Sequence, residues 1–252
     1  MPPLSVVIIA RDEADRLPEA LRSVAFADER LVLDSGSADG TPEVARALGA
    51  RVVETDWPGH VAQKNRALGL ATHAWVLSLD ADERVSPALA ASIRVALAEE
   101  PAVDGFAVAR RNHYLGQPLG WGGWYPDRRV RLVRRARARW GGTDPHDRLE
   151  VDGPIARLHG DLDHHPYRSA QEHLDTIARY ARRAAEVDPT PGHAWDPVGR
   201  ATWRFLRGYL LQLGFLDGRA GLSVAWLGAR YTHLKWALRA SRDGSESGRD
   251  DR

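Results

Sequence analysis

The chain has 252 residues, of which 43% are hydrophobic, and its 35 lysines and arginines balance 34 acidic residues to give a formal net charge of +1 at pH 7. This length and apolar content suit one substantial domain with an appendage, and the near-neutral charge argues against a nucleic-acid partner. The chain contains no cysteine, which excludes a disulfide framework, a cysteine-ligated zinc site and a thiol nucleophile.

The first apolar run, from Leu4 to Ala10, is only as long as a strand and lacks the charged leader of a signal peptide. No window of the sequence reaches the roughly 18 uncharged apolar residues that a membrane span requires. The best later candidate, 220–229, is bounded by Arg219 and Arg230. We therefore expect a cytoplasmic protein that does not cross a bilayer.

The first hundred residues alternate between apolar strand patterns and amphipathic helical patterns. Strands are expected at 5–10, 30–34, 51–54 and 75–79, and helices at about 14–25, 41–49, 60–72 and 87–99. Such a rhythm is typical of an α/β fold whose parallel sheet carries helices on both faces. Neither GxGxxG nor GxxxxGK[ST] occurs, so phosphate must be bound in another way, such as through a metal ion.

An acidic loop, Asp34-Ser-Gly-Ser-Ala-Asp39-Gly-Thr, follows the second expected strand. The carboxyl edge of a parallel sheet is where open α/β folds bind their ligands. A carboxylate there can accept hydrogen bonds from a nucleobase or a ribose, whereas an Asp or Ser before a helix can also serve as its cap. We assign ligand binding to Asp34 and capping to Asp39.

The expected strand 75–79 ends in three acids, Asp80, Asp82 and Glu83. Because Asp80 and Asp82 are two residues apart, their side chains leave the same face of an extended chain and can converge on one Mg²⁺ or Mn²⁺ ion. Oxygens of a substrate diphosphate can fill the positions that such an ion keeps open. The alternative is a solvated turn before the next helix, with Asp82 or Ser86 as its cap.

After about residue 104 the rhythm changes to shorter extended runs, expected at 105–111 and 129–133. The intervening loop, 115–127, is rich in Gly, Trp and Pro and carries Trp121, Trp124 and Tyr125. These aromatic side chains could stack on a sugar or plug the edge of the sheet, and we favour an acceptor-sugar contact.

Residues 128–139 hold seven arginines among twelve residues, alternating in part with Val, Leu and Ala as a strand would. This pattern predicts one strongly cationic face. Arginine matches phosphate and carboxylate oxygens, so an anionic acceptor such as a phosphorylated glycolipid is one hypothesis. A solvated strand face that pairs with acids elsewhere is the alternative.

Three further helices are expected at about 169–187, 198–215 and 218–240, and disorder at 241–252. Residues 198–240 contain seven lysines and arginines against the single acid Asp217, with tryptophans interleaved. Basic helices with interfacial aromatics can lie on an anionic membrane, so peripheral contact with an inner membrane is one interpretation. Packing of two antiparallel helices against each other is the other.

Taken together, IIARDEADRL, VLDSGSADGT, Gln63-Lys64-Asn65, LSLDADE and Asp144-Pro-His146-Asp147-Arg-Leu resemble the family 2 inverting glycosyltransferases of the GT-A fold. The chain looks most like the lipopolysaccharide core β-glucosyltransferase group, over about residues 4–240. The resemblance implies a Rossmann-like, mostly parallel sheet with flanking helices and a C-terminal helical extension. It implies a transferase domain at 1–188, with a nucleotide-sugar half at 1–103 and an acceptor half at 104–188. C-terminal amphipathic helices follow at 189–240, and a disordered tail at 241–252.

The resemblance also implies a role for each matching residue. Nucleotide binding is implied for Ala10, Arg11, Glu13, Asp34, Lys64 and Asp80, metal ligation for Asp82 and His164, and general base catalysis for Asp147. The neighbouring His165 leaves the choice of histidine open.

The chain departs from the family pattern in places, since Ala10 and Asp12 stand where Thr and Asn are usual and Asp147 stands where Glu is usual. The shorter base must be placed by its backbone within about 2.6–3.2 Å of the acceptor hydroxyl. A salt bridge to Arg148 or another nearby arginine is the alternative role for Asp147.

The implied activity is metal-dependent transfer of a hexosyl group, with Mg²⁺ or Mn²⁺, from a nucleoside-diphosphate sugar to a hydroxyl of a glycolipid or lipopolysaccharide-core acceptor, forming a β-linkage. A UDP-sugar donor is favoured. A haloacid-type phosphatase would require Thr and an apolar residue where Glu83 and Arg84 follow Asp82, and a sugar nucleotidyltransferase would require a glycine-rich loop that ARDEADRL lacks. The non-enzyme alternative is a degenerate GT-A-fold module that binds membrane or glycan.

Overall fold

A computed structural model describes residues 1–143, 146–187, 190, 193 and 195–247, without the side chains of His146 and 242–247. The chain divides into two compact units. The first unit comprises 1–110 and 127–164, and the second comprises 111–126 and 165–252. The helix expected at 169–187, which the sequence grouped with the transferase domain, therefore clusters with the C-terminal helices.

Four parallel strands begin the sheet of the first unit: β1 (Leu4–Ala10), β2 (Glu29–Asp34), β3 (Arg51–Glu54) and β4 (Trp75–Asp80). β1 lies between β2 and β4, and β3 pairs with the outer side of β2. Ala10 pairs with Asp34, and Ile9 pairs with Asp80. The register therefore brings the two predicted ligand-binding acids to the same edge of the sheet, on either side of β1.

The expected helices of this half are all present: α1 (Leu17–Ser23), α2 (Thr41–Ala47), α3 (His60–Leu70) and α4 (Pro87–Ala98). Helices α1, α2 and α4 each have a proline in their first turn, where its missing N–H leaves no hydrogen bond unmade. Ser86 caps α4, because its hydroxyl accepts the amide hydrogen of Leu89 at 3.2 Å. The sequence had left this capping role open between Ser86 and Asp82.

The sheet continues through strands that are not part of the parallel rhythm: β8 (Asp127–Arg134), β6 (Gly105–Tyr114), β11 (Ile155–His164) and β5 (Glu83–Val85). The strand order is β3-β2-β1-β4-β8-β6-β11-β5, with β7 (Gln117–Pro118) paired to β6. β8 runs antiparallel to both β4 and β6. The result is a mixed α/β fold, in which the parallel half matches the sequence prediction and the antiparallel half extends it.

The arginine-rich stretch 128–139 does not form one strand. It is divided between β8, a 3₁₀ turn at Arg135–Arg137 and β9 (Ala138–Thr143), which forms a hairpin with β10 (His146–Val151). The prediction that these arginines form the single cationic face of one strand is therefore wrong. Arginines recur along the whole stretch, but the 3₁₀ turn divides them between two strands, so they do not share one strand face.

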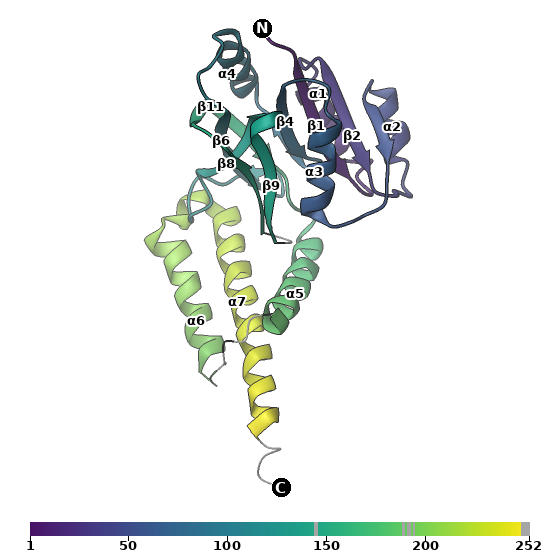
Figure 1. The fold of residues 1–252 in the computed structure, drawn as a ribbon. Coiled ribbons are helices and arrows are strands. Elements are labelled where there is room, and N and C mark those ends of the chain that lie inside the picture. The colour runs from purple at the N-terminus through teal and green to yellow at the C-terminus, as the bar shows by residue number, and fades with distance from the viewer. Residues whose placement is uncertain (144–145, 188–189, 191–192, 194, 248–252) are drawn as a thin grey trace. The chain divides into compact units, whose positions relative to one another are not determined.

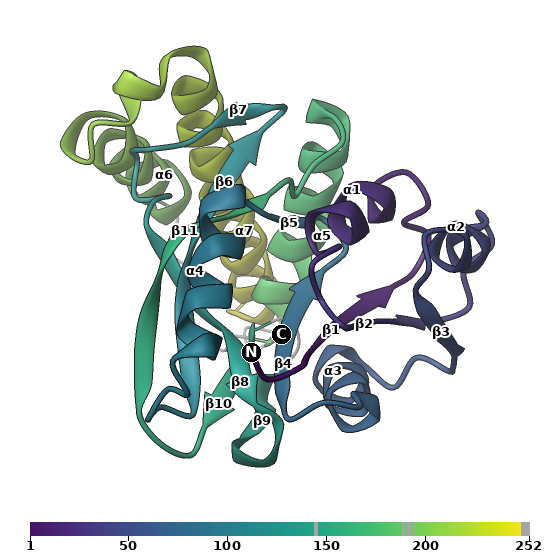
Figure 2. The same cartoon turned by 90° about the horizontal axis from the view of Figure 1, so that it is seen from above.

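Helices lie on both faces of the parallel strands, with α1 on one side and α3 on the other, as Figure 2 shows. Val6 and Ile8 of β1 join one cluster with α1, α2 and α4, while Val7 joins a second cluster with α3. The alternation follows from the two-residue period of a strand. Trp140 and Leu149 of the β9–β10 hairpin complete the second cluster, and this places the hairpin beside α3.

The second unit is helical: α5 (Ala170–Val187), α6 (Asp196–Leu206) and α7 (Gly218–Ser247) (Figure 1). A π-helical turn at Arg207–Leu211 and a 3₁₀ turn at Gly214–Asp217 join α6 to α7. α7 extends past the end expected at 240, and 248–252 lie outside the described residues. None of the described helices combines the length and hydropathy of a membrane-spanning segment.

Candidate functional site

The loops after β1 and β2 are tied together by hydrogen bonds. Asp12 donates its amide hydrogen to the Ser37 hydroxyl and accepts the amide hydrogen of Ala38, both at 2.9 Å. Its φ of 54° lies in the left-handed region, which Asp and Asn tolerate better than other side chains. Asp12, which stands where the family usually has Asn, is therefore a residue type that tolerates this left-handed backbone conformation.

Asp34 fixes the loop that follows it. Its buried carboxylate accepts the amide hydrogens of Gly36 and Ser37, at 3.0 and 2.9 Å, and the hydroxyl of Ser37 at 2.5 Å. Asp39 accepts the amide hydrogen of Thr41, the first residue of α2, at 3.0 Å, but the N-cap residue of α2 is Gly40, which has no side chain to cap the helix, so the assignment of Asp39 to capping is wrong. The nucleobase contact expected for Asp34 stays a prediction. The hydrogen bonds described for the Asp34 carboxylate come from Gly36 and Ser37 in the loop that follows it.

The other residues predicted to bind nucleotide near this edge come from the loop after β1. Ala10 is buried at the end of the strand, and its carbonyl accepts the amide hydrogen of Ser35 at 3.0 Å. Arg11 is exposed, and the carboxylate of Glu13 lies 3.6 Å from Nε of Arg16. The structure thus places Ala10, Arg11 and Glu13 next to the loop of Asp34.

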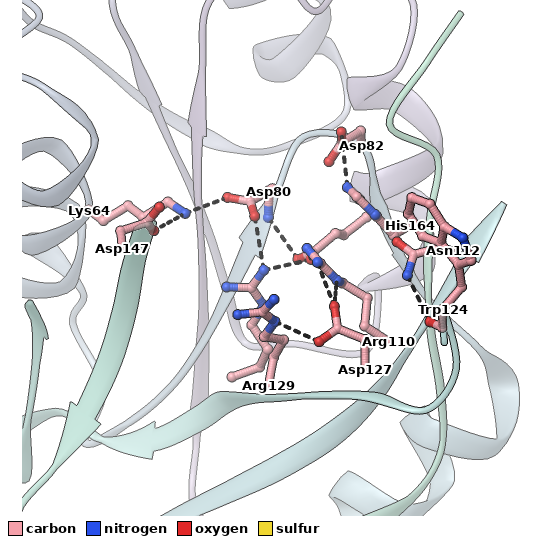
Figure 3. Close-up of polar contacts among 12 residues, drawn as sticks. Lys64, Asp80, Asp82, Arg110, Asn112, Trp124, Asp127, Arg129, Asp147 and His164 are labelled. Carbon is pink, nitrogen blue, oxygen red and sulfur yellow. Dashed lines mark hydrogen bonds and ion pairs between the residues drawn. The ribbon is translucent and has the colours of Figure 1, made fainter. Parts of the chain in front are cut away.

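Lys64 joins the carboxylates of two predicted site residues from distant parts of the chain (Figure 3). Its Nζ lies 2.9 Å from Oδ1 of Asp80 and 2.7 Å from Oδ2 of Asp147. Burial disfavours the charged ammonium, but the two carboxylates outweigh burial and raise the pKa of Lys64. The structure therefore brings the predicted base and two predicted nucleotide-binding residues into direct contact.

The alternative pairing of Asp147 with Arg148 does not occur. Arg148 pairs instead with Glu150, at 2.9 Å. Asp147 lies in β10, opposite Gly142 of β9, so the hairpin sets its position. The preceding Asp144, which belongs to the motif that identified Asp147, lies outside the described residues.

A buried ion pair beneath Asp80 was not predicted from the sequence. Nη2 of Arg131 lies 2.9 Å from Oδ2 of Asp80 and 2.6 Å from Oε1 of Glu83. The other oxygen of Glu83 accepts the amide hydrogen of Asp80 at 3.1 Å. Glu83 is fully buried and Arg131 is only 5% exposed. These contacts fix both the backbone and the carboxylate of Asp80.

The charges around Asp80 act together on its ionisation. Burial alone would raise the pKa of Asp80, but Lys64 and Arg131 hold it well below its usual range. The chain of charges continues through Arg110, which contacts Glu83 at 3.6 Å and Asp127 at 2.6 Å. Asp80 is therefore an anion at neutral pH.

Most arginines of 128–139 have acidic partners in the structure. Beyond Arg131, the pairs join Arg129 to Asp127, Arg134 to Asp104, Arg137 to Asp152 and Arg139 to Glu150. This outcome corresponds to the alternative in which the arginines pair with acids of the same chain. One local signal could have indicated that Arg131 is buried: it directly precedes the apolar residues Leu132 and Val133 in the buried part of β8.

Asp82 and His164, the two predicted metal ligands, are neighbours. Oδ2 of Asp82 lies 3.5 Å from Nε2 of His164 and 3.5 Å from Nη1 of Arg16, a residue that the sequence analysis did not select. His164 reaches this place because β11 pairs with β5, where His164 is opposite Glu83. His165 instead stacks on His113, with ring centroids 4.4 Å apart. His164 is therefore the histidine beside Asp82, and its role as a metal ligand stays a prediction.

The donor set at this place fits an incomplete divalent-metal site. Within the described part of the chain no three His, Asp or Glu side chains form a ready metal site. One carboxylate and one imidazole, each less than a fifth exposed, suit an ion such as Mn²⁺ that completes its coordination with substrate and water oxygens. Asp82 and His164 are the residues that could hold it.

The three predicted acceptor residues lie in the second unit. Trp121 is 45% exposed, and its amide hydrogen is accepted by Asp217 at 2.9 Å. The carbonyl of Trp124 accepts a hydrogen bond from Asn112 at 3.1 Å, and Tyr125 lies beneath the guanidinium of Arg111. Trp121 is thus the most accessible of the three rings, and its contact with an acceptor sugar stays a prediction.

Comparisons with known proteins agree with this arrangement. Residues 5–148 match the family model described as glycosyl transferase family 2. The lipopolysaccharide core biosynthesis glycosyltransferase LpsC of Rhizobium meliloti is 26% identical over 260 residues, which cover 94% of each chain. A TPR repeat-containing protein of Synechococcus elongatus is 40% identical over 119 residues, or 46% of this chain, but the matched part spans only 29% of that protein's length.

The fold has solved counterparts among GT-A glycosyltransferases. The mannosyltransferase PcManGT of Pyrobaculum calidifontis, solved in complex with GDP-Man and Mn²⁺, superposes with a TM-score of 0.54 at 17% identity. The superposition covers 96% of this chain and 88% of that one. The family match extends over more than half of the chain, from β1 through Asp147. The chain therefore belongs to glycosyl transferase family 2.

Proposed function

We propose that this chain is a metal-dependent inverting glycosyltransferase that transfers a hexosyl group from a nucleoside-diphosphate sugar to a hydroxyl of a glycolipid or lipopolysaccharide-core acceptor. The observation that carries the proposal is the position of Lys64 between Asp80 and Asp147. It places one buried cation between the acid expected to bind the donor and the acid expected to act as base. Family membership supports the reaction class, and the name of the relative LpsC supports the acceptor class.

The donor would bind along the edge formed by the loops after β1, β2 and β4. Asp34 and Asp80 lie on either side of β1 there, and the ammonium of Lys64, 2.9 Å from Asp80, would bind the diphosphate. Because Lys64 is buried, its attraction to a diphosphate would be stronger than that of an exposed lysine. A UDP-sugar is the donor that we favour.

Asp82 and His164 are the residues that would hold the divalent ion. Bound there, Mg²⁺ or Mn²⁺ would neutralise the charge that develops on the departing diphosphate. Arg16, at 3.5 Å from Asp82, would orient that carboxylate and add positive charge to the same place. Lys64 would contribute a second positive charge to the leaving group.

Asp147 would act as the single general base. The acceptor hydroxyl would lose its proton to the Asp147 oxygen opposite the one that contacts Lys64, and its oxygen would bond to the anomeric carbon. The bond from that carbon to the phosphate oxygen would break, and its electron pair would leave with the diphosphate. One displacement inverts the anomeric centre, so an α-linked donor would give a β-linked product.

A second candidate is a GT-A-fold module that binds nucleotide or glycan without catalysis. The observation that favours it is the 2.7 Å ion pair between Lys64 and Asp147, which occupies one oxygen of a base already shorter than the usual Glu. This candidate predicts nucleotide binding without turnover.

Calorimetric titration of UDP, GDP, dTDP and their common sugar conjugates, with and without Mn²⁺, tests the proposal. We expect metal-dependent binding that is lost in Asp82→Asn and His164→Ala. His159→Ala is the matched control, since that exposed histidine lies on the same strand, β11. Absence of binding by every nucleotide under both metal conditions would contradict the donor-site assignment.

The Asp147→Asn variant separates the two candidates. We expect it to bind nucleotide as the wild type does and to transfer sugar to core-oligosaccharide acceptors at a rate lower by roughly 10²–10⁴-fold, the range for loss of a general base. Wild-type binding without turnover, on any such acceptor, would favour the binding module.

A further inference from the structure

Large apolar side chains are concentrated on the connection between α6 and α7. Between 206 and 216, six such side chains are each 38% to 66% exposed: Leu206, Leu210, Leu211, Leu213, Phe215 and Leu216. We call this set the apolar tip. Trp203 and Trp226, at 58% and 52% exposed, lie on the two helices next to it. Scattered single apolar residues are normal on a protein surface, but a contiguous group of this kind marks an interaction site.

The charges around the apolar tip are mostly positive. Arg204, Arg207 and Arg219 are exposed on the same helices and turns. Asp217 is the only acid in the sequence between 198 and 240, against seven lysines and arginines, and its carboxylate accepts the amide hydrogens of Gly120 and Trp121 at 3.0 and 2.9 Å. Exposed leucines, tryptophans and an excess of arginines together match the interface of a membrane with anionic lipids.

The apolar tip is also joined to the loop that carries Trp121. Besides the two hydrogen bonds to Asp217, the amide hydrogen of Gly122 is donated to the carbonyl of Gln212 at 2.9 Å. Both segments belong to the second unit. Hydrogen bonds therefore join the loop of Trp121, the residue expected to stack on the acceptor sugar, to the apolar tip and to Asp217 beside it.

We propose that the apolar tip and its arginines dock this protein on an anionic membrane surface, so that Trp121 receives the sugar of a lipid-linked acceptor at the level of the head groups. The acceptor step rests on the proposed function, whereas the lipid contact does not. The leucines and Phe215 enter the boundary between head groups and acyl chains. Arg204, Arg207 and Arg219 remain at the phosphates.

Vesicle flotation of the full chain tests the docking, without donor or acceptor present. We expect the wild type to float with vesicles of phosphatidylcholine and phosphatidylglycerol, and to remain unbound with phosphatidylcholine alone. The Leu210→Ser/Leu211→Ser variant is expected to lose at least about tenfold in partition coefficient. The Arg207→Gln/Arg219→Gln variant is expected to lose roughly fivefold for each arginine, and added salt should weaken the wild type similarly.

The matched control is Leu70→Ser/Val95→Ser, which changes two exposed apolar residues of the first unit and should leave flotation unchanged. Circular dichroism would check that each variant remains folded. Three outcomes would overturn the proposal: a wild type that does not float with anionic vesicles, an equal loss in the control, or a dimer that the Leu210/Leu211 variant dissociates while flotation is unchanged. A failure of nucleotide binding would instead overturn the proposed function and leave the flotation result standing.

Discussion

Replacing Arg131 by Met tests the buried charges beneath Asp80. The change leaves Glu83, which is fully buried, without the guanidinium that lies 2.6 Å away, and leaves Asp80 without one of its two cations. Loss of one partner from a buried pair costs about 3–5 kcal/mol of unfolding free energy. Because Arg110 stays 3.6 Å from Glu83 and compensates in part, we expect the lower value, about 3 kcal/mol.

For a chain of this size, that loss corresponds to a fall of roughly 6–12 °C in the melting temperature. Thermal and urea unfolding followed by circular dichroism would measure it. The control is Arg139→Met, whose side chain is 79% exposed and pairs with Glu150 at 3.1 Å, and which should cost less than about 1 kcal/mol. The double variant Glu83→Met/Arg131→Met should be more stable than Arg131→Met alone. Equal costs for Arg131→Met and Arg139→Met would refute this account of the site.

Three further changes probe the remaining parts of the first unit. Lys64→Met should lower kcat/KM for sugar transfer by roughly 10²-fold in initial-rate assays, because the buried cation at the diphosphate is lost; an unchanged rate would exclude that role. Burial tends to raise the pKa of Glu29, but hydrogen bonds lower it from 4.5 to about 2. The stabilisation that the ionised Glu29 contributes is therefore complete above pH 4.5 and is lost as the pH falls towards 2. Glu29→Gln should flatten that part of an acid unfolding curve. Gly160→Ala should lower the unfolding free energy by about 2 kcal/mol or more, because φ is +92° and a Cβ would lie 2.3 Å from the Leu89 nitrogen. The control is Gly36→Ala, which also has a positive φ but open space around it and should cost about 1 kcal/mol.

The parallel half of the fold could be predicted from the sequence because its signals are local. The run 75–80 is apolar apart from Ser78 until it ends in Asp80, and the helices on either side of it have regular apolar spacing. β11 has no such signal, because IARLHGDLDH mixes polar and apolar residues and its partner β5 is more than 70 residues earlier in the chain. The antiparallel half thus depends on pairings that no short window of sequence contains.

The candidate site was predictable as a set of residues but not as a set of contacts. Lys64 and Asp147 were each selected through the family resemblance, but their ion pair joins positions 83 residues apart. Arg131 was placed on an exposed cationic face because arginines surround it in the sequence. The structure buries it, since Glu83 and Asp80 supply the carboxylates that make burial of a guanidinium favourable.

The two cations at Asp80 differ in what they can do during the proposed reaction. Arg131 cannot leave its place, because Glu83 would then be a buried carboxylate without its closest partner. Lys64 is a point charge on a flexible stem, and it can exchange a carboxylate for a phosphate oxygen at similar distance with little net change in electrostatic energy. In the proposed mechanism Lys64 would contact the arriving diphosphate, while the Asp147 oxygen opposite the one beside Lys64 would take the acceptor proton. Arg131 would meanwhile keep Asp80 in position, so that donor binding and activation of the base are coupled through a single ammonium group.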